Sequence, residues 1–334
     1  MNAELIGWTT AEPVVTYGRE SVSIEELYAI NTAVLEDVYP TKTVETKAKQ
    51  PTFSFDAKSG IAPAVKVAKP KVLIPVFPGT NCEYDSARAV MRAGAEADIA
   101  VIRNLTADDV ARSVEDVAKR IADSQMIFIP GGFSGGDEPD GSAKFITAFF
   151  RNPDIKEQVT RLLEERDGLM CGICNGFQAL IKLGLVPYGM IRDTDDTCPT
   201  LTFNTIGRHQ SRIVRTRIAS NKSPWLSLMN VGDIVNVPIS HGEGRFFASE
   251  ELALQLAANG QIATQYVDLE GNPTMDAAFN PNGSLFAIEG ITSPDGRVFG
   301  KMGHSERIGN GLYRNVPGEY DIRMFEAAVK YFKG

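Results

Sequence analysis

Between residues 71 and 184 the sequence alternates short apolar runs with longer amphipathic segments. The apolar runs are KVLIPVF, ADIAVI, QMIFIPGG and GLMCGI, and each is followed by one or two segments whose apolar residues recur with helical spacing. Strands with continuous apolar runs that alternate with helices are typical of a parallel sheet covered on both faces. The pattern therefore predicts an α/β fold with a mostly parallel central sheet flanked by helices.

The rest of the chain has a different pattern. After about residue 200 it is strand-rich: RIVRTRI, IVNVPIS, QIATQYV, LFAIEGIT and VFGKMGH are predicted to be extended, and MFEAAVKYFKG to form a closing helix. Residues 1–47 favour a small α+β fragment, with strands at ELIGWTT and PVVTYG. A helix is predicted over SVSIEELYAINTAVLEDVYP, with Ser23 as N-cap and Glu26 completing a capping box. Residues 48–70, rich in Ala, Lys, Pro and Ser, are predicted to be a linker.

Charge and composition restrict the class of function. The net charge of −8 argues against a nucleic-acid partner, which would require a basic surface. The one basic stretch, GRHQSRIVRTR at 207–217, favours a solvated strand face over a phosphate-binding strip. No apolar run approaches the ~18 residues of a membrane helix, and the N-terminus lacks the features of a signal peptide. Four cysteines are too few for a disulfide scaffold, so we expect a cytoplasmic protein.

The segment DGLMCGICNGFQALIKLGL, residues 167–185, holds two cysteines in C-x-x-C spacing. The five residues GICNG around Cys174 have the layout of a nucleophile elbow, in which glycines permit a tight turn from strand to helix. Cys174 would then lie at a helix N-terminus, where free N–H groups and the helix dipole favour a thiolate. Cys171 falls near the end of an apolar strand, where a small hydrophobic residue is expected. By itself, the turn does not distinguish a nucleophile from a buried core cysteine.

A thiol nucleophile needs a base, and the base needs an orienting group. The chain has three histidines. His304 has Glu306 two residues on, and His241 has Glu243 at the same spacing; either pair at a strand end can place both side chains on one side. Spacing alone leaves these two pairs open. His209 has no such partner and is expected to be structural or exposed.

Three loops that follow predicted strands are expected to meet. All three would lie at the carboxyl ends of parallel strands, which is where open α/β sheets bind their ligands. The loops are FPGTNCE, PGGFSGGDEPDG and CGICNG. Backbone N–H groups of Gly131 and Gly132, together with that of Asn175, can supply an oxyanion hole there.

Rival functions are less well supported by the residues. A C-x-x-C redox protein would need both Cys171 and Cys174, whereas an enzyme with Cys174 as its single nucleophile would tolerate Cys171→Ser. A zinc site lacks a second Cys/His pair with ligand spacing, so no metal is expected. A non-catalytic scaffold or binding module is disfavoured because Cys, His and Glu occur together. The sequence also has no nucleotide-binding glycine motif.

These motifs resemble a known family. CGICNGFQ, the preceding PGG loop and the late His-x-Glu look like a class I (triad) glutamine amidotransferase domain, which has a flavodoxin-like fold. FPGTNCEYDSARA (77–89) and ISHGEGRF (239–246) resemble the glutaminase region of the phosphoribosylformylglycinamidine synthase family, and ISHGEGRF argues against an amidotransferase that serves a different synthetase. The resemblance covers about residues 71–334. Residues 1–47 are similar to the end of the preceding, AIR-synthase-like synthetase domain in the long single-chain form.

The resemblance implies roles for particular residues. Cys174, His304 and Glu306 would form the catalytic triad. The oxyanion hole and the glutamine-binding surface would comprise Gly131, Gly132, Phe133, Asn175 and Gln178. The loop with His241, Glu243 and Arg245 would face the substrate or the ammonia path. Two departures from the family stand out: Ser305 replaces the usual proline, and Gly135, followed by acidic Asp137 and Glu138, replaces the usual tyrosine.

The resemblance also implies a reaction and partners. L-Glutamine would be hydrolysed through a cysteine thioester. The ammonia would pass to a synthetase domain that converts formylglycinamide ribonucleotide to the amidine in purine biosynthesis. ATP and Mg²⁺ would be needed only in that synthetase part, and no cofactor is expected in this chain.

Overall fold

The computed structural model describes residues 3–40, 43, 48–57, 62–134, 142–309 and 311–333. The chain divides into two compact units, Met1–Val44 and Glu45–Gly334, and every candidate site residue lies in the second. The departures at Gly135, Asp137 and Glu138 fall outside the described residues.

The small unit consists of a hairpin and one helix. β1 (Val14–Tyr17) pairs antiparallel with β2 (Glu20–Ser23), and α1 (Ile24–Ala33) follows directly. Ser23 caps the helix as predicted, since its Oγ accepts a hydrogen bond from the Glu26 N–H at 3.0 Å. α1 has no buried residue, so this unit has little core of its own.

Two predictions for the small unit are wrong. Residues 4–10 form no strand, because a strand needs a neighbour for its backbone and, in the described part of this unit, β1 pairs only with β2. Leu5, Ile6 and Trp8 stay exposed as a result. The predicted helix is also shorter than its pattern, because its first three residues belong to β2 and the chain turns after Ala33.

The large unit is built on one sheet. Within the described residues it has nine strands, in the order β4-β3-β5-β6-β13-β12-β11-β8-β9. The first five run parallel and the rest are antiparallel. In this order the strands are β4 (Glu96–Val101), β3 (Lys71–Val76), β5 (Met126–Ile129), β6 (Leu169–Ile173), β13 (Val298–Lys301), β12 (Ile288–Thr292), β11 (Ile262–Tyr266), β8 (Gln210–Ile218) and β9 (Ile234–His241). A separate ribbon pairs β7 (Thr200–Thr202) with β10 (Arg245–Phe247).

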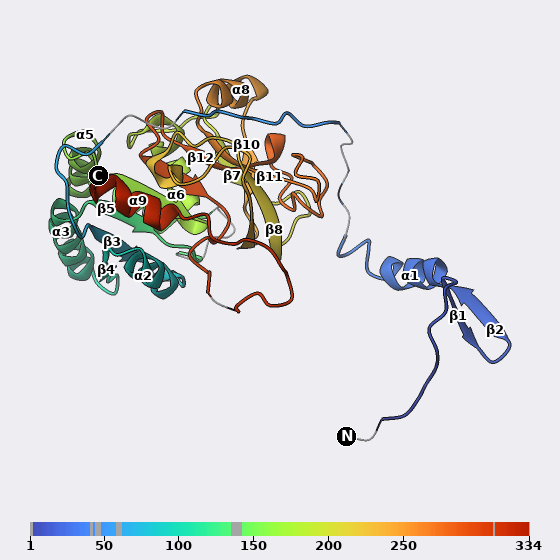
Figure 1. Cartoon of the computed structure of the whole chain (residues 1–334). Coiled ribbons are helices and arrows are strands. Elements are labelled where there is room, and N and C mark those ends of the chain that lie inside the picture. The colour runs from blue at the N-terminus through green and yellow to red at the C-terminus, as the bar shows by residue number, and fades with distance from the viewer. Residues whose placement is uncertain are drawn as a thin grey trace. The chain divides into compact units, whose positions relative to one another are not determined.

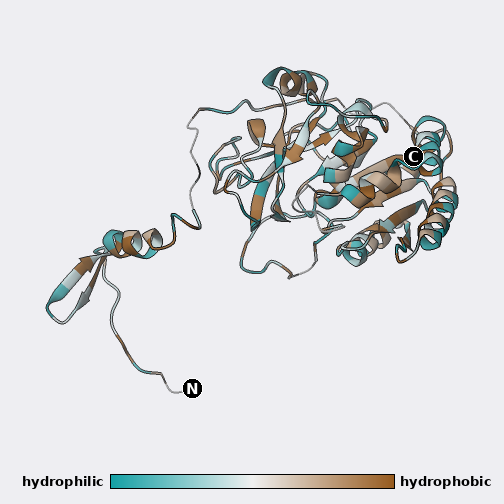
Figure 2. Ribbon diagram, turned by 180° about the vertical axis from the view of Figure 1, so that it is seen from behind, coloured by the Kyte–Doolittle hydropathy of each residue, from teal (hydrophilic) through white to brown (hydrophobic). Residues whose placement is uncertain are grey.

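Helices flank this sheet, as the sequence pattern predicts. They are α2 (Glu83–Arg92), α3 (Ala107–Asp123), α4 (Lys144–Phe150), α5 (Pro153–Glu164), α6 (Asn175–Lys182), α7 (Leu185–Tyr188), α8 (Glu250–Ala258) and α9 (Met324–Lys333), with 3₁₀ turns η1 (Pro224–Leu226) and η2 (Leu285–Ala287). Figure 1 shows α2, α3, α5 and α9 around the parallel half of the sheet, and Figure 2 shows apolar residues concentrated along the strands. None of the helices in the described ranges is long and apolar enough to cross a bilayer.

Helices pack on opposite faces of the sheet at β6. Phe128 of β5 is the register partner of Cys171 and lies 5.3 Å, between ring centroids, from Phe325 of α9. Because side chains alternate along a strand, Gly172 faces the other side, where α6 packs. The α/β prediction is therefore confirmed, with the C-terminal half of the chain supplying the antiparallel strands.

The segment predicted to be a linker is partly held by specific contacts. The Phe53 N–H donates to Gln265 Oε1 at 2.9 Å, and the Phe55 N–H donates to the Ala219 carbonyl at 2.8 Å. Phe53 also lies 5.9 Å from Phe286, between ring centroids. The Ala, Lys, Pro and Ser content of the segment did not predict these contacts, because they are made by its two phenylalanines. As a domain connection, the linker stays a prediction.

The basic strand β8 is not simply a solvated face. Arg212 and Arg215 donate to the carbonyls of Ala277 and Asp268, at 3.2 and 3.0 Å. Arg217 donates to the Phe53 carbonyl at 2.7 Å. These arginines hold neighbouring loops against the sheet, which corrects the expectation of a merely solvated surface.

Candidate active site

Cys174 occupies a sharp turn between β6 and α6. Its backbone has φ 54° and ψ −107°, a strained conformation that costs a non-glycine residue on the order of 1–3 kcal/mol. The turn is held from both ends, because the Cys174 N–H donates to the Lys301 carbonyl at 2.9 Å and its carbonyl accepts from the Gln178 N–H at 3.0 Å. Strain of this kind, kept in place by its surroundings, is typical of a nucleophile elbow.

The two glycines of the turn are required by close packing. A Cβ on Gly172 would lie 2.5 Å from the Gly176 carbonyl, and a Cβ on Gly176 would overlap the carbonyl of Ile129 in β5. Both contacts are with backbone, which has little freedom to move. The glycine spacing that marked the turn in the sequence therefore has a steric cause.

Gly176→Ala is expected to destabilise the protein by about 2–3 kcal/mol, because the new methyl group must displace β5 or α6. Gly309→Ala is the matched control: its Cβ would meet nothing within 4 Å, and we expect a change below about 0.5 kcal/mol. Urea unfolding measures both. Equal stability of the two variants would contradict the steric account.

His304 and Glu306 form a buried pair beside Cys174. His304 Nδ1 lies 2.6 Å from Glu306 Oε1, and both side chains are almost fully buried. They follow β13, whose Lys301 is the register partner of Ile173 at the end of β6. The turns after these two parallel strands therefore share one edge of the sheet, which brings His304 to Cys174. Gly131 lies between them, since a Cβ there would be 2.7 Å from His304 Cε1 and 3.4 Å from Cys174 Cβ.

The surroundings of His304 favour its charged form. Burial lowers the pKa of the imidazole, but the Glu306 charge and hydrogen bonds with Cys174, Cys82 and Glu306 outweigh this and raise it well above its usual range. With Nδ1 directed to the carboxylate, Nε2 is the nitrogen that serves Cys174. The pair can therefore stabilise a thiolate as an imidazolium–thiolate ion pair.

His241 lacks an equivalent partner, which separates the two histidine pairs that the sequence left open. Both its ring nitrogens are buried without a hydrogen-bond partner among the described residues, and Glu243 Oε2 accepts instead from the Ser142 N–H at 3.1 Å. Burial, followed by the charges of His304 and His209, lowers the pKa of His241 to about 3. His241 is therefore neutral at neutral pH, and only His304 is oriented by a carboxylate.

The loop after β5 is positioned for the expected oxyanion hole. Gly132 pairs with Thr80 in an isolated antiparallel bridge. The hydrogen bonds of this bridge are made by its neighbours, from Asn81 N–H to the Gly131 carbonyl and from Phe133 N–H to the Gly79 carbonyl, at 3.2 and 2.9 Å. The Gly132 N–H takes part in neither of these two hydrogen bonds. Gly132 also lines the same cavity as Cys174.

The side chains of Asn175 and Gln178 connect three loops. Asn175 Oδ1 accepts from the Ser134 N–H at 3.2 Å, and Asn175 Nδ2 donates to Gln178 Oε1 at 2.9 Å. Gln178 Nε2 donates to the Glu243 carbonyl at 2.7 Å. Asn204, which the sequence did not single out, holds the same loop by accepting from the Gly244 N–H at 3.1 Å. These amides hold the loops around the cysteine together.

A cavity of about 560 Å³ opens over the thiol. It is lined by Gly132, Phe133, Cys174, Gln178, Phe203, Gly207, Arg208, His209, His241, Gly242 and Glu243. Arg245 lies on β10 and is not among these lining residues. His209 was expected to be structural or exposed, and it is exposed at the rim of this cavity. Arg208 was expected to belong to a solvated strand face, and its position in the cavity corrects that expectation.

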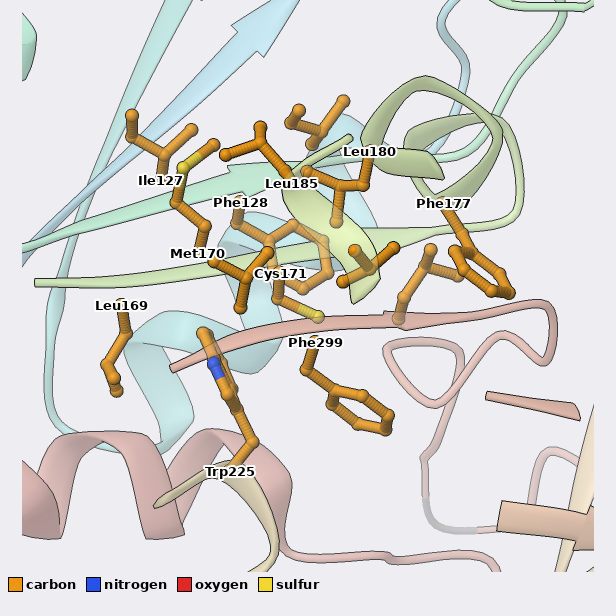
Figure 3. Close-up of a cluster of buried hydrophobic side chains, with 14 of the residues drawn as sticks. Ile127, Phe128, Leu169, Met170, Cys171, Phe177, Leu180, Leu185, Trp225 and Phe299 are labelled. Carbon is orange, nitrogen blue, oxygen red and sulfur yellow. The ribbon is translucent and has the colours of Figure 1, made fainter. Parts of the chain in front are cut away.

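Cys171 is separated from this site. It is fully buried on β6, on the same face of the sheet as its register partners Phe128 and Phe299 (Figure 3), and burial raises the pKa of its thiol well above the usual range. All four cysteines are free. An inaccessible thiol next to a strained one does not fit a redox pair.

In the part of the chain that the structure describes, one group has metal-ligand spacing. Cys82, His304 and Glu306 place ligand atoms within 4.8 Å of one another. However, Arg307 Nη2 donates to Cys82 Sγ at 2.9 Å, and His304 Nδ1 is already bonded to the carboxylate. A cationic guanidinium on the sulfur disfavours a second cation, so we interpret the group as part of the thiol site.

The fold and the site together define a glutamine amidotransferase. The chain belongs to the CobB/CobQ-like glutamine amidotransferase domain family, whose model matches residues 69–332. It is 37% identical over 286 residues to the phosphoribosylformylglycinamidine synthase subunit PurQ of Methanococcus maripaludis, covering 79% of this chain and 97% of that protein. The PurQ subunit of Salinibacter ruber is 32% identical, with coverage of 77% and 94%. The solved PurLQS structure from Thermotoga maritima is similar with a TM-score of 0.56 and 25% identity, over 79% of this chain and 100% of that one.

Proposed function

We propose that this chain is the glutaminase of a phosphoribosylformylglycinamidine synthase. It hydrolyses glutamine and supplies ammonia for the ATP-dependent conversion of formylglycinamide ribonucleotide to the amidine. The observation that supports the chemistry is the contact of the His304–Glu306 pair with Cys174, the thiol that lines the cavity. The similarity to PurQ subunits over most of the chain supports formylglycinamide ribonucleotide as the acceptor of the ammonia.

The geometry supports a thioester mechanism. The Cys174 thiolate attacks the side-chain amide carbon of glutamine, and the carbonyl oxygen takes up negative charge near the Gly132 N–H. His304, as an imidazolium, gives its proton to the departing nitrogen, which leaves as ammonia and produces a γ-glutamyl thioester. His304 then takes a proton from water, the resulting hydroxide attacks the thioester, and glutamate and the free thiolate are released.

The cavity wall also suits the α-carbon end of glutamine. Arg208 Nη1 and Glu243 Oε1 are buried, without hydrogen-bond partners among the described residues, and both residues line the cavity. A guanidinium and a carboxylate complement the α-carboxylate and α-ammonium groups of an amino acid. Neutral His241, which lines the same cavity, can accept or donate one further hydrogen bond.

The partners and surroundings of the chain follow from the same proposal. ATP and Mg²⁺ act in the synthetase that receives the ammonia, and the glutaminase reaction uses only the residues above. Residues before 69 lie outside the family match. Their assignment to the end of a synthetase domain stays a prediction, and so does the cytoplasmic location.

A reconstitution assay tests the acceptor. The chain is mixed with a phosphoribosylformylglycinamidine synthetase subunit that lacks its own glutaminase, and amidine formation from formylglycinamide ribonucleotide and ATP is measured. We expect glutamine to support synthesis only when the chain is added, while ammonium salts support it without the chain. Glutamine hydrolysis without any glutamine-dependent amidine would assign the chain to another synthetase.

A further inference from the structure

A fully buried ion pair lies beneath the catalytic turn. Lys301, the last residue of β13, places its Nζ 3.2 Å from Glu289 Oε1 on the neighbouring strand β12, and both side chains are 0% exposed. Removing two charges from water is costly unless additional hydrogen bonds satisfy them. The identity of those hydrogen bonds therefore indicates what the pair is for.

One of these hydrogen bonds comes from the sheet, where Thr264 Oγ1 of β11 donates to Glu289 Oε2 at 2.5 Å. The other three come from the turn that carries His304. Glu289 Oε1 accepts from the Gly303 N–H at 2.6 Å. Lys301 Nζ donates to the Gly303 carbonyl at 2.9 Å and to Ser305 Oγ at 3.0 Å. The residues immediately before and after His304 are thus bound by the two charges. A Cβ on Gly303 would lie 3.0 Å from Glu289 Oε1, so this close approach depends on glycine.

Lys301 also contacts the nucleophile turn. Its carbonyl accepts from the Cys174 N–H at 2.9 Å, while its side chain binds the His304 turn. A single residue therefore connects the backbones that carry the thiol and the imidazole. Ser305, which departs from the proline usual at this position, supplies one of the groups that Lys301 binds.

We propose that Lys301 and Glu289 are positioning residues that set the spacing of Cys174 and His304, with the Ser305 hydroxyl as the third member. The proposal rests on the catalytic roles assigned to Cys174 and His304. Neither Lys301 nor Glu289 lines the cavity, so their effect is on the rate of the chemical step and not on glutamine binding. A small displacement of reacting groups is enough to slow catalysis by about 100-fold.

The central test is the double variant Lys301→Met/Glu289→Met. Replacing both partners of a buried ion pair by apolar residues is often neutral for stability, whereas removing one leaves a buried charge unpaired. We expect thermal unfolding near that of the wild type, KM for glutamine within about twofold, and kcat lower by about 10- to 100-fold. A folded double variant with wild-type kcat would overturn the proposal, as would equal losses in kcat and binding.

Ser305 keeps the proposal testable if the double variant does not fold. Ser305→Ala should lower kcat by about 3- to 10-fold, and Ser305→Thr, which retains the hydroxyl, should restore most of it. Equal kcat values for the alanine variant and the wild type would contradict the proposal.

Arg297→Met is the matched control. It breaks the Arg297–Asp295 ion pair, of 2.7 Å, just before β13, at the opposite end of the strand from His304. We expect a change in stability without a change in kcat. Cys174→Ala in the same assay tests the catalytic role of Cys174 separately from the positioning role of Lys301 and Glu289. If that variant turns over glutamine, the catalytic assignment itself fails.

Discussion

Replacing Cys174 by alanine is expected to reduce glutamine hydrolysis by at least about 10⁴-fold. Cys174 is the thiol that lines the cavity, and removing a nucleophile from a triad typically costs most of the rate enhancement. Glutamine binding should survive, because the cavity wall from Arg208 to Glu243 is unchanged. Glutamate release measures the first effect, and calorimetric titration with glutamine measures the second.

Cys171→Ser is the matched control for this prediction. It alters the other sulfur of the C-x-x-C pair, which is buried in the core and has no contact with the cavity. We expect a small loss of stability and near-normal turnover in the folded fraction. Loss of activity in both variants, together with thiol-disulfide exchange by the wild type, would favour the redox alternative.

His304→Asn is expected to lower kcat by about 10³- to 10⁴-fold, because it removes both the partner of the thiolate and the proton donor to ammonia. Glu306→Gln should cost about 10²-fold, since it keeps a hydrogen-bond acceptor for Nδ1 but removes the charge that stabilises the imidazolium. Steady-state kinetics with glutamine measures both. A wild-type kcat in either variant would mean that His241 or another group is the base.

The Glu306→Gln variant should also change the pH profile. The Glu306 charge raises the pKa of His304, so the imidazolium persists to higher pH in the wild type than it would without that charge. Activity that depends on the imidazolium is present below the His304 pKa and is lost as the pH rises through it. Removing the charge lowers that pKa, so the alkaline limb of kcat/KM should move to lower pH. An unchanged or opposite shift would contradict the assigned roles.

The sequence predicted the parallel half of the fold well because its signals are local. The helix at Ala107–Asp123 matches its amphipathic pattern from end to end, and the spacing of the glycines around Cys174 marks the turn. The failures are non-local. The segment at residues 4–10 has strand-forming residues but lacks a neighbouring strand among the described residues.

The site, too, was predicted from the sequence only where its signals are local. Spacing made His241 and His304 equivalent, and only the pairing of β13 with β6, 125 or more residues apart in the chain, distinguishes them. Arg208 was assigned to a solvated face because it belongs to a basic stretch, and His209 was expected to be structural or exposed because it has no carboxylate two residues on. They reach the cavity through a loop whose path no local pattern encodes. The contact of Ser305 with Lys301 was not predicted either, because a lysine is rarely fully buried and Lys301 is.

Covalent labelling tests the central claim, that Cys174 is the residue that attacks glutamine. The 334-residue chain is incubated with 6-diazo-5-oxo-L-norleucine, a reactive glutamine analogue, and the modified peptide is identified by mass spectrometry, with and without excess glutamine. We predict a single modification on Cys174, suppressed by glutamine, with loss of glutaminase activity in proportion to labelling. Modification of Cys82, Cys171 or Cys198 in place of Cys174 would contradict the account.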